Sequence, residues 1–173
     1  MESYQLKKAG MEQAEEVMSI YRSLVGSPGC TWSEKYPVME DVERDIANDS
    51  LYVLYDGPAI IAAAFMGPTD EFEHLTFWDP SIRRPCDLAR IGVRKEYQGR
   101  GIAKELIRRI EPDLVRRGFD GVQLLVCKTN PKAEAVYRAS GFQYCGETEI
   151  YDNQWNCYEK KIGPAAAPEE KTC

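Results

Sequence analysis

Apolar side chains recur along this chain with two different spacings, and each spacing predicts a different kind of element. In four segments they return every three or four residues, as they do on one face of an amphipathic helix. The third segment contains Pro112, which is expected to kink or split it, and the fourth follows Asn130, a capping residue placed before Pro131. The predicted helices cover residues 11–25, 39–47, 101–118 and 131–141.

Other short segments are apolar or alternate between apolar and polar residues, and turn residues bound them, as is typical of strands. Gly92 indicates a bulge in one of them, and the last two meet at a turn formed by Asp152 and Asn153. The stretch 67–85 has no clean period; it allows an edge strand in its middle, with loops at its ends. The predicted strands are 4–9, 51–55, 59–65, 88–93, 121–127 and two strands within 142–162.

The order of these elements indicates a mixed α/β protein. Its C-terminal half reads as strand, glycine-containing turn, helix, strand and helix. A chain of 173 residues is long enough to bury one core without metals or disulfides. We therefore expect one domain over residues 1–162 and a mobile tail over residues 163–173.

Composition excludes several classes of protein. Hydrophobic residues make up 43% and charged residues 29%, the balance of an ordinary globular protein, and the longest apolar run is strand-sized. The N-terminus has no apolar signal segment, which predicts a cytoplasmic protein without membrane partners. Six scattered cysteines and one histidine lack the spacing of a zinc site or disulfide framework, which favours reduced thiols and no bound metal. A net charge of −6 disfavours nucleic acid and favours small cationic partners.

The segment EYQGRGIAKEL, residues 96–106, places two glycines directly before a helical run. Outward amide N–H groups at a helix N-terminus bind anions, phosphate above all. Arg94, Arg100 and Lys104 add positive charge, although a plain strand-to-helix connection would have the same glycines. The P-loop pattern is absent from the chain. The dinucleotide-binding pattern GxGxxG has Lys104 in place of its third glycine, and the next strand ends in a lysine where that kind of site needs an acid to hold the ribose. The turn therefore matches neither pattern.

A third pattern fits this turn. Residues 98–103, QGRGIA, match (R/Q)xxGx(G/A), and the later segment NPKAEAVYRASGF, residues 130–142, matches the helix motif that accompanies it. With both motifs in the right order, the sequence resembles the GNAT superfamily of N-acyltransferases over about residues 4–162. The resemblance implies an α/β (α+β) fold with a mixed, mostly antiparallel sheet of six to seven strands and about four flanking helices.

The resemblance also implies acetyl-CoA as the cofactor. Amides of the glycine turn would hold its pyrophosphate, and the strand before the turn would pair with the pantetheine arm where it splays from the strand 121–127. Asn130 would cap its helix and contact the cofactor. The implied cofactor-binding residues are Ile91, Gly92, Val93, Gln98, Gly99, Arg100, Gly101, Ile102, Ala103, Lys104, Asn130 and Tyr137.

Two catalytic residues follow from the same resemblance. Tyr137 stands where family members carry the tyrosine that protonates the departing thiolate, although an aromatic residue here could equally pack in the core. Asp87 stands where several members carry a glutamate base, and a solvated strand-end carboxylate is the alternative. Glu71, Glu73 and His74 are rival bases. A backbone N–H near Ile91 is the expected oxyanion donor.

The acceptor is predicted to be a small cationic primary amine rather than a protein. The family's substrates pass the loop between the first two helices and the last hairpin, where this chain offers aromatic and acidic side chains. The alternative is a regulatory module that binds acyl-CoA with little or no turnover. The family also makes a homodimer possible. The candidate acceptor residues are Trp32, Tyr36, Glu73, His74, Tyr151 and Trp155.

Overall fold

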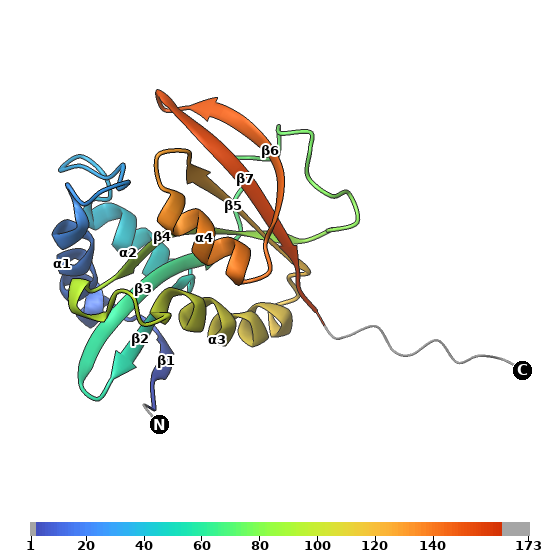
Figure 1. Cartoon of the computed structure of the whole chain (residues 1–173). Coiled ribbons are helices and arrows are strands. Elements are labelled where there is room, and N and C mark those ends of the chain that lie inside the picture. Colours follow the sequence, from blue (N-terminus) through green and yellow to red (C-terminus); the bar gives the residue numbers. More distant parts are fainter. Residues whose placement is uncertain (1–2, 164–173) are drawn as a thin grey trace, which may run out of the picture.

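The computed structural model describes residues 3–163 and is built around one seven-stranded sheet (Figure 1). The sheet is antiparallel except where β4 and β5 run parallel. From one edge to the other its strands are β1 Gln5–Lys8, β2 Leu51–Asp56, β3 Ala59–Gly67, β4 Pro85–Val93, β5 Gly121–Cys127, β7 Asn153–Lys161 and β6 Gln143–Ile150.

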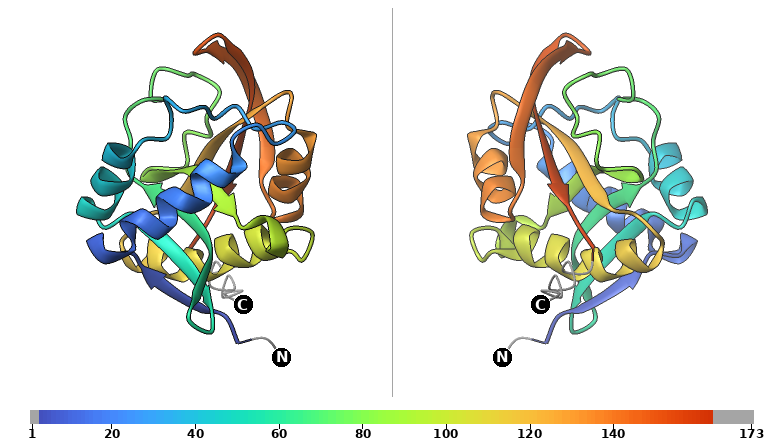
Figure 2. Two further views of the ribbon diagram at one scale, coloured as in Figure 1. Left: turned by 90° about the vertical axis from the view of Figure 1, so that its left-hand side faces the viewer. Right: turned by 90° about the vertical axis from the view of Figure 1, so that its right-hand side faces the viewer.

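Helices cover both faces of this sheet (Figure 2). Two 3₁₀ turns, η1 Met11–Gln13 and η2 Lys95–Tyr97, precede helices α1 and α3. The helices are α1 Ala14–Leu24, α2 Met39–Ala47, α3 Ile102–Arg116 and α4 Pro131–Ala139. The expected sheet and the four expected helices are confirmed. Among the described residues no helix is long and apolar enough to cross a membrane.

Strand β2 divides the apolar core between the two faces. Leu51 and Val53 belong to the cluster beneath α1 and α2, whereas Tyr52 and Leu54 belong to the cluster beneath α3 and α4. Successive side chains of a strand point to opposite faces, so a strand covered on both sides needs apolar residues at nearly every position. This explains the continuous apolar runs that predicted the β2–β3 hairpin.

The structure corrects the sequence-based account of residues 67–85. No strand forms within 68–84, because the backbone closes successive turns, with Leu75 N–H donating to Phe72 O and Ile82 N–H to Asp79 O. Strand β4 begins at Pro85, three residues before the predicted start. The tight turn of the last hairpin consists of Tyr151 and Asp152, both with positive φ, and so lies one residue earlier than predicted.

Two further predictions concern irregular positions. Helix α3 is not split at Pro112, and Ile110 and Leu114 on either side of the proline are anchored in the core. The bulge of β4 lies at Arg90 and Ile91 and not at Gly92, since Ala63 pairs with Gly92 and Phe65 with Ala89. The predicted mobile tail begins at residue 163, and its residues 164–173 lie outside the described part of the chain.

Strands β4 and β5 pair over a short distance only. Pro85, Cys86 and Asp87 face Gly121, Val122 and Gln123, and beyond Asp87 the two strands separate. Strand β5 nevertheless stays paired with β7 along its whole length. The predicted splay is therefore confirmed, and it opens the sheet near its centre.

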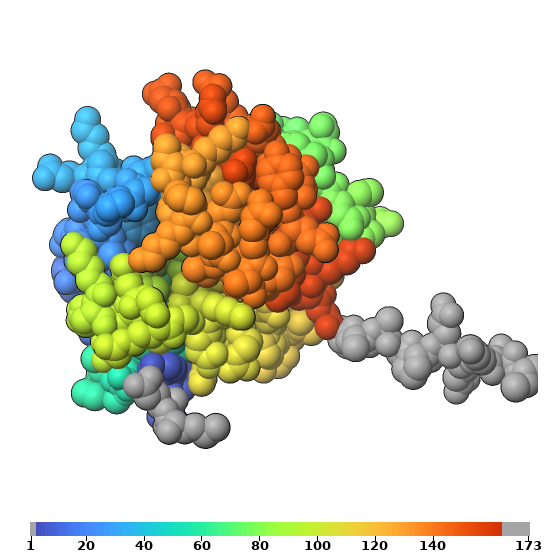
Figure 3. Space-filling model, in the orientation of Figure 1, coloured from blue at the N-terminus to red at the C-terminus, as the bar shows by residue number. Residues whose placement is uncertain are grey.

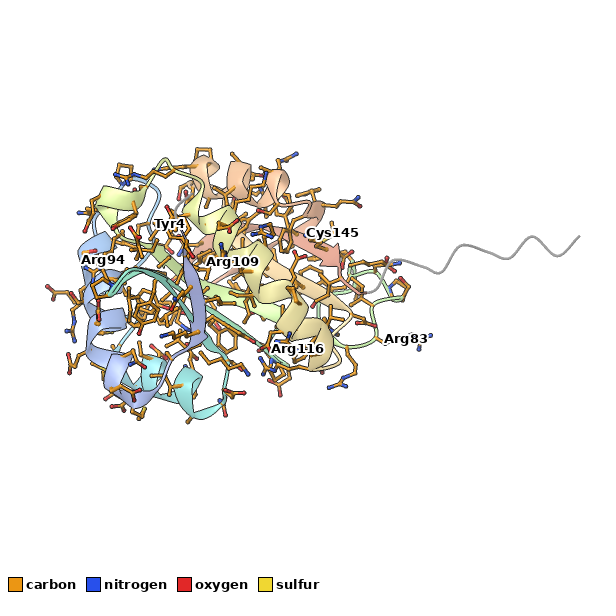
Figure 4. The ribbon with its side chains drawn as sticks, turned by 90° about the horizontal axis from the view of Figure 1, so that it is seen from below. Tyr4, Arg83, Arg94, Arg109, Arg116 and Cys145 are labelled. Carbon is orange, nitrogen blue, oxygen red and sulfur yellow. The ribbon has the colours of Figure 1, made fainter. Side chains whose placement is uncertain are left out.

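The α1–α2 loop and the segment before β1 are tied to neighbouring elements. The loop between α1 and α2 crosses to α4, where a Cβ added to Gly29 would lie 3.0 Å from Asn130 Oδ1 (Figure 2). Seen from below, Arg109 of α3 reaches the start of β1 and donates to Tyr4 O over 2.7 Å (Figure 4). Arg94 pairs with Glu16 of α1 at 2.9 Å.

Candidate active site

The glycine turn forms a cradle of free amides at the start of α3. Gly99 and Gly101 adopt φ values of +76° and +74°, which L-residues rarely take, and nothing lies within 4 Å of a Cβ built on either. None of the backbone N–H groups from Gly99 to Lys104 donates to another residue within 3–163. An anion is the ligand that this arrangement fits.

Basic side chains surround the cradle at the surface. The Arg100 guanidinium lies over the Tyr97 ring at 5.2 Å, and Lys132 Nζ lies 3.4 Å from Gln98 Oε1. Arg94, which the sequence analysis placed here, instead binds Glu16 and the carbonyl of Ile60. Figure 3 shows the surface of residues 94–104, in yellow-green, next to that of α4, in orange.

The edge of β4 leads from this cradle into the opening. Gln98 Nε2 donates to Val93 O over 3.1 Å, so the Val93 carbonyl already accepts a hydrogen bond from the glycine turn. Asn130 caps α4, with Oδ1 accepting from the Ala133 N–H at 3.1 Å. The part of β4 beyond Asp87 has no partner on β5. This stretch, which includes Ile91 and Gly92, is available to an added extended chain.

Arg90 holds the β4 bulge against α2. Its backbone has a φ of +47°, and its guanidinium donates twice to Asp45 at 2.8 Å and once to the Tyr36 hydroxyl at 2.9 Å. The guanidinium also lies 4.7 Å from the centre of the Phe65 ring. Burial raises the pKa of Asp45, and the bonds to Arg90 oppose this rise. The pair therefore fixes the conformation of the bulge.

Gly92 makes room for an aromatic ring. A Cβ there would lie 3.0 Å from Tyr21 Cδ1 and 3.2 Å from Leu24 Cδ1, so α1 packs directly on the β4 backbone. Tyr21 in turn meets Trp32 edge-on at 5.1 Å. Beside Tyr21 a cleft of about 670 Å³ opens between α1, α2 and their loop, with Glu34 and Glu40 in its wall.

Asp87 is the buried acid of the site. It is 6% exposed, and its Oδ1 and the Tyr21 hydroxyl are the two buried side-chain oxygens without a hydrogen-bond partner among the described residues. Burial raises the pKa of Asp87 well above its ordinary value, and the negative charge of Glu71 adds to the rise while Arg90 opposes it. Such a carboxylate holds a proton more strongly than an ordinary aspartate and is a better base.

Tyr137 of α4 approaches Asp87 from the other face of the sheet. The neighbours of Asp87 in β4, Cys86 and Leu88, point into the α3 and α4 core, so Asp87 points to the opposite face. Tyr137 is itself part of that core and 7% exposed. Burial, followed by the charge of Asp87, raises the pKa of Tyr137, so the phenol keeps its proton at physiological pH.

The predicted acceptor residues are distributed around the Asp87 side of the opening. Tyr36 binds Arg90, and Trp32 packs on Tyr21. The Tyr151 hydroxyl donates to Glu71, and Trp155 Nε1 donates to Ile150 O at 3.0 Å within the last hairpin. Glu73 and His74 are exposed on the loop 68–84, and of the acids of that loop it is Glu71 whose charge acts on Asp87.

Arg90, Asp45 and Tyr21 were missed as site residues. The available signal was a charge inside an apolar element, since Arg90 interrupts the strand segment LARIGV and Asp45 follows Val42 by three residues on the buried face of α2. Pairing them requires knowledge that α2 lies against the β4 bulge. Local periodicity does not contain that information.

Comparison with known proteins identifies the family. The model of the Acetyltransferase (GNAT) family matches residues 17–142, which include the glycine turn, Asp87 and Tyr137. The chain belongs to this family. It is therefore an acyltransferase that transfers acetyl groups from acetyl-CoA.

Solved structures with the same fold extend over nearly the whole acetyltransferase. A GNAT-family acetyltransferase from Streptococcus agalactiae has 18% identity and a TM-score of 0.77, covering 92% of this chain and 95% of its own. The ribosomal-protein-S18-alanine N-acetyltransferase from Escherichia coli has 16% identity and a TM-score of 0.71, covering 97% and 98%. A Salmonella typhimurium structure with its cofactor acetyl-CoA has 14% identity and a TM-score of 0.73, covering 97% and 99%.

The residues of the acetyltransferase fit coenzyme A. The cradle of free amides from Gly99 to Lys104 suits a pyrophosphate, and open space above both glycines permits its close approach. The unpaired edge of β4 suits an extended amide-containing arm that leads toward Asp87 and Tyr137.

We predict that Gly101→Val weakens acetyl-CoA binding at least about tenfold. Valine at a positive φ costs about 1–2 kcal/mol in the backbone, and its side chain would fill the space above the cradle. Gly57→Val is the matched control, because Gly57 also has a positive φ of 54° and open space around it but lies in the β2–β3 turn. Calorimetry should give a weaker Kd for Gly101→Val alone; equal Kd values would remove the cradle from the binding site.

We predict that Asp87→Asn stabilises the free protein at neutral pH by at least about 1 kcal/mol, because the amide, like a protonated carboxyl group, has no charge to bury. The pKa of Asp87 is raised in the folded state, so the parent loses stability as the pH rises through that pKa. The advantage of the variant should therefore grow from acid to neutral pH in urea unfolding.

Asp79→Asn is the control, because its effect on stability should depend on pH in the opposite direction. The pKa of Asp79 is lowered, first by its bond to the Ser81 side chain, so its contribution to stability is lost as the pH falls. A stability difference for Asp87→Asn that does not change with pH would contradict the raised pKa.

Proposed function

We propose that this acetyltransferase acetylates a small cationic primary amine by direct attack, with Asp87 as the base and Tyr137 as the acid. The proposal rests on one observation above all. Asp87, a buried carboxylate with a partnerless oxygen, is the last residue of β4 that pairs with β5, and the buried phenol of Tyr137 belongs to the core on the opposite face. Burial raises the pKa of both groups, and the charge of Asp87 adds to the rise at Tyr137. Buried groups with shifted pKa values are typical of acid–base chemistry.

The reaction requires two proton movements. When bound, acetyl-CoA supplies the acetyl group as a thioester; transfer forms an N–C bond and breaks the C–S bond. An ammonium acceptor gives up two protons in total, one of which ends on the leaving sulfur and the other in solvent. The protein must therefore remove a proton from nitrogen and provide one for sulfur.

Asp87 suits the first movement. An aspartate with an ordinary pKa is a weak base toward an ammonium group, whereas a raised pKa brings the two affinities closer. Its Oδ1 accepts no hydrogen bond from a described residue, so it can receive the proton directly or through a water molecule. Its negative charge also favours the approach of a cation.

Tyr137 suits the second movement. The phenol retains its proton because burial and the charge of Asp87 raise its pKa, so its O–H can donate to a thiolate. The bulge supports the third requirement, stabilisation of an oxyanion, because Arg90 and Ile91 have no partner residues on β3. The Ile91 N–H is our candidate for that donor.

The charges near Asp87 favour a cationic acceptor. Arg90 is compensated by its two bonds to Asp45, so it contributes little net positive charge to the site. Asp87 and Glu71 remain as acids whose charges act on one another. Tyr36 and Trp32 add aromatic surface on the same side, which suits an alkylammonium group.

The test is release of coenzyme A thiol with a panel of acceptors. We expect turnover with simple alkylamines and polyamines, weaker turnover with amino acids, and little with a short peptide that begins with alanine. The peptide is included because one structural relative acts on ribosomal-protein alanine by its name. Preferential acetylation of the peptide would overturn the proposed acceptor class, and cofactor binding without any turnover would support a binding module.

We predict that Tyr137→Phe lowers kcat about 10²-fold or more and changes KM and acetyl-CoA affinity little. The variant keeps the ring that packs 6.0 Å from Phe142 and removes the proton donor alone. Steady-state kinetics and calorimetry measure the two effects separately. An unchanged kcat would reduce Tyr137 to a packing residue.

A further inference from the structure

The loop 68–84 is fixed to the last hairpin on the Asp87 side of the sheet. The Phe77 ring lies so close to Gly146 of β6 that an added Cβ would be 2.6 Å from Phe77 Cδ1. The Asp79 N–H donates to both carboxylate oxygens of Glu159 on β7 at 3.1 Å. Figures 1 and 2 show this loop, in green, beside β6 and β7. Residues of the loop therefore have a defined position.

Glu71 lies where this loop meets the tip of the hairpin. Its carboxylate accepts a hydrogen bond from the Tyr151 hydroxyl, and Tyr151 occupies the tight turn between β6 and β7. Both side chains are exposed, Tyr151 to 69%. Glu71 is thus a carboxylate held at the surface by a contact that spans 80 residues of sequence.

Glu71 and Asp87 differ in depth. Asp87 is 6% exposed and has a partnerless oxygen, whereas Glu71 faces solvent. Gly67 of β3 faces Asp87 of β4, and Glu71 follows Gly67 by four residues, so the loop that carries Glu71 starts beside Asp87. The negative charge of Glu71 raises the pKa of Asp87. The charged or titratable groups that act on or respond to Asp87 are Glu71, Arg90, Tyr137 and Cys86. Arg90 is the single cation of that group and is already bound to Asp45.

We propose that Glu71, held by Tyr151, determines acceptor specificity by binding a second ammonium group, so that the preferred acceptor is a short diamine. This inference rests on the proposed function and deepens it. The reacting nitrogen lies at Asp87, gives a proton to that carboxylate and forms the N–C bond as the C–S bond of the thioester breaks, and the leaving sulfur takes its proton from Tyr137. The distal nitrogen stays protonated at the mouth of the site beside Glu71, where water and the carboxylate both solvate it.

The charge at the mouth also distinguishes acceptors that differ at their far end. A monoamine leaves the Glu71 carboxylate without a counterion. An amino acid places its own carboxylate near that of Glu71, and the two negative charges repel each other. An exposed ion pair contributes up to about 1 kcal/mol, which corresponds to about fivefold in kcat/KM. Because both partners face water, salt should reduce the preference.

The test compares three acceptors with the same four-carbon chain: 1,4-diaminobutane, butylamine and γ-aminobutyrate. In the parent enzyme kcat/KM should be about fivefold higher for the diamine than for butylamine, and lowest for γ-aminobutyrate. Glu71→Gln should bring the first two values together, and Tyr151→Phe should act in the same direction by loosening Glu71. Glu71→Gln should also move the acidic limb of the pH profile to lower pH, since it removes a charge that raises the pKa of Asp87.

Glu149→Gln is the matched control. It removes the same charge two residues before Tyr151, but strand alternation places Glu149 on the face of β6 that carries Glu147, opposite Gly146 and the loop. The diamine preference should survive in this variant. Equal kcat/KM for diamine and butylamine in the parent, or equal loss of preference in the Glu71 and Glu149 variants, would overturn the role of Glu71 and leave the proposed function standing. Absence of turnover with all three acceptors, despite acetyl-CoA binding, would overturn the proposed function itself.

Discussion

The separation of β4 from β5 after Asp87 is the constraint on which the rest of the site depends. A parallel pair that continued to Val93 would close the sheet, bury the β4 edge in hydrogen bonds and leave no path between its two faces. The pairing stops after three residue pairs, the last at Asp87, and the charge of Asp87 acts on Tyr137 of the opposite face. The same opening leaves the β4 backbone unpaired next to the amide cradle of α3.

The Arg90–Asp45 pair holds the bulge of β4, which follows the end of its pairing with β5. A bulge with a positive φ at arginine is unfavourable by itself, and burying two charges adds a desolvation cost that their attraction offsets only in good geometry. The two bonds of 2.8 Å provide that geometry, and the Tyr36 hydroxyl and the Phe65 ring occupy further faces of the guanidinium. We interpret the pair as a device that fixes the direction of β4, since apolar residues would stabilise the core at least as well.

The sequence predicted those parts of the molecule whose cause is local. The glycine turn needs positive φ at positions 99 and 101, and the α4 cap needs Asn130 before Pro131, so both can be read from a few adjacent residues. Parts that depend on distant residues were not predictable in this way. The loop 68–84 has no period because Gly146, Glu159 and Tyr151 of the last hairpin hold it. The location of the bulge depends on Asp45 of α2.

The arrangement of charge follows from the same geometry. Asp87 points away from the α3 and α4 face, on which the amide cradle and Tyr137 lie, so a proposed acceptor and a thioester would meet from opposite sides of the sheet. In the proposed mechanism an acid on the acceptor side would attract a cation and receive its proton, and a phenol on the other side would remain neutral next to the sulfur. Exchanging these positions would put a negative charge beside the departing thiolate and disfavour its release. In the proposed mechanism the sheet therefore separates two proton transfers that need opposite electrostatic environments.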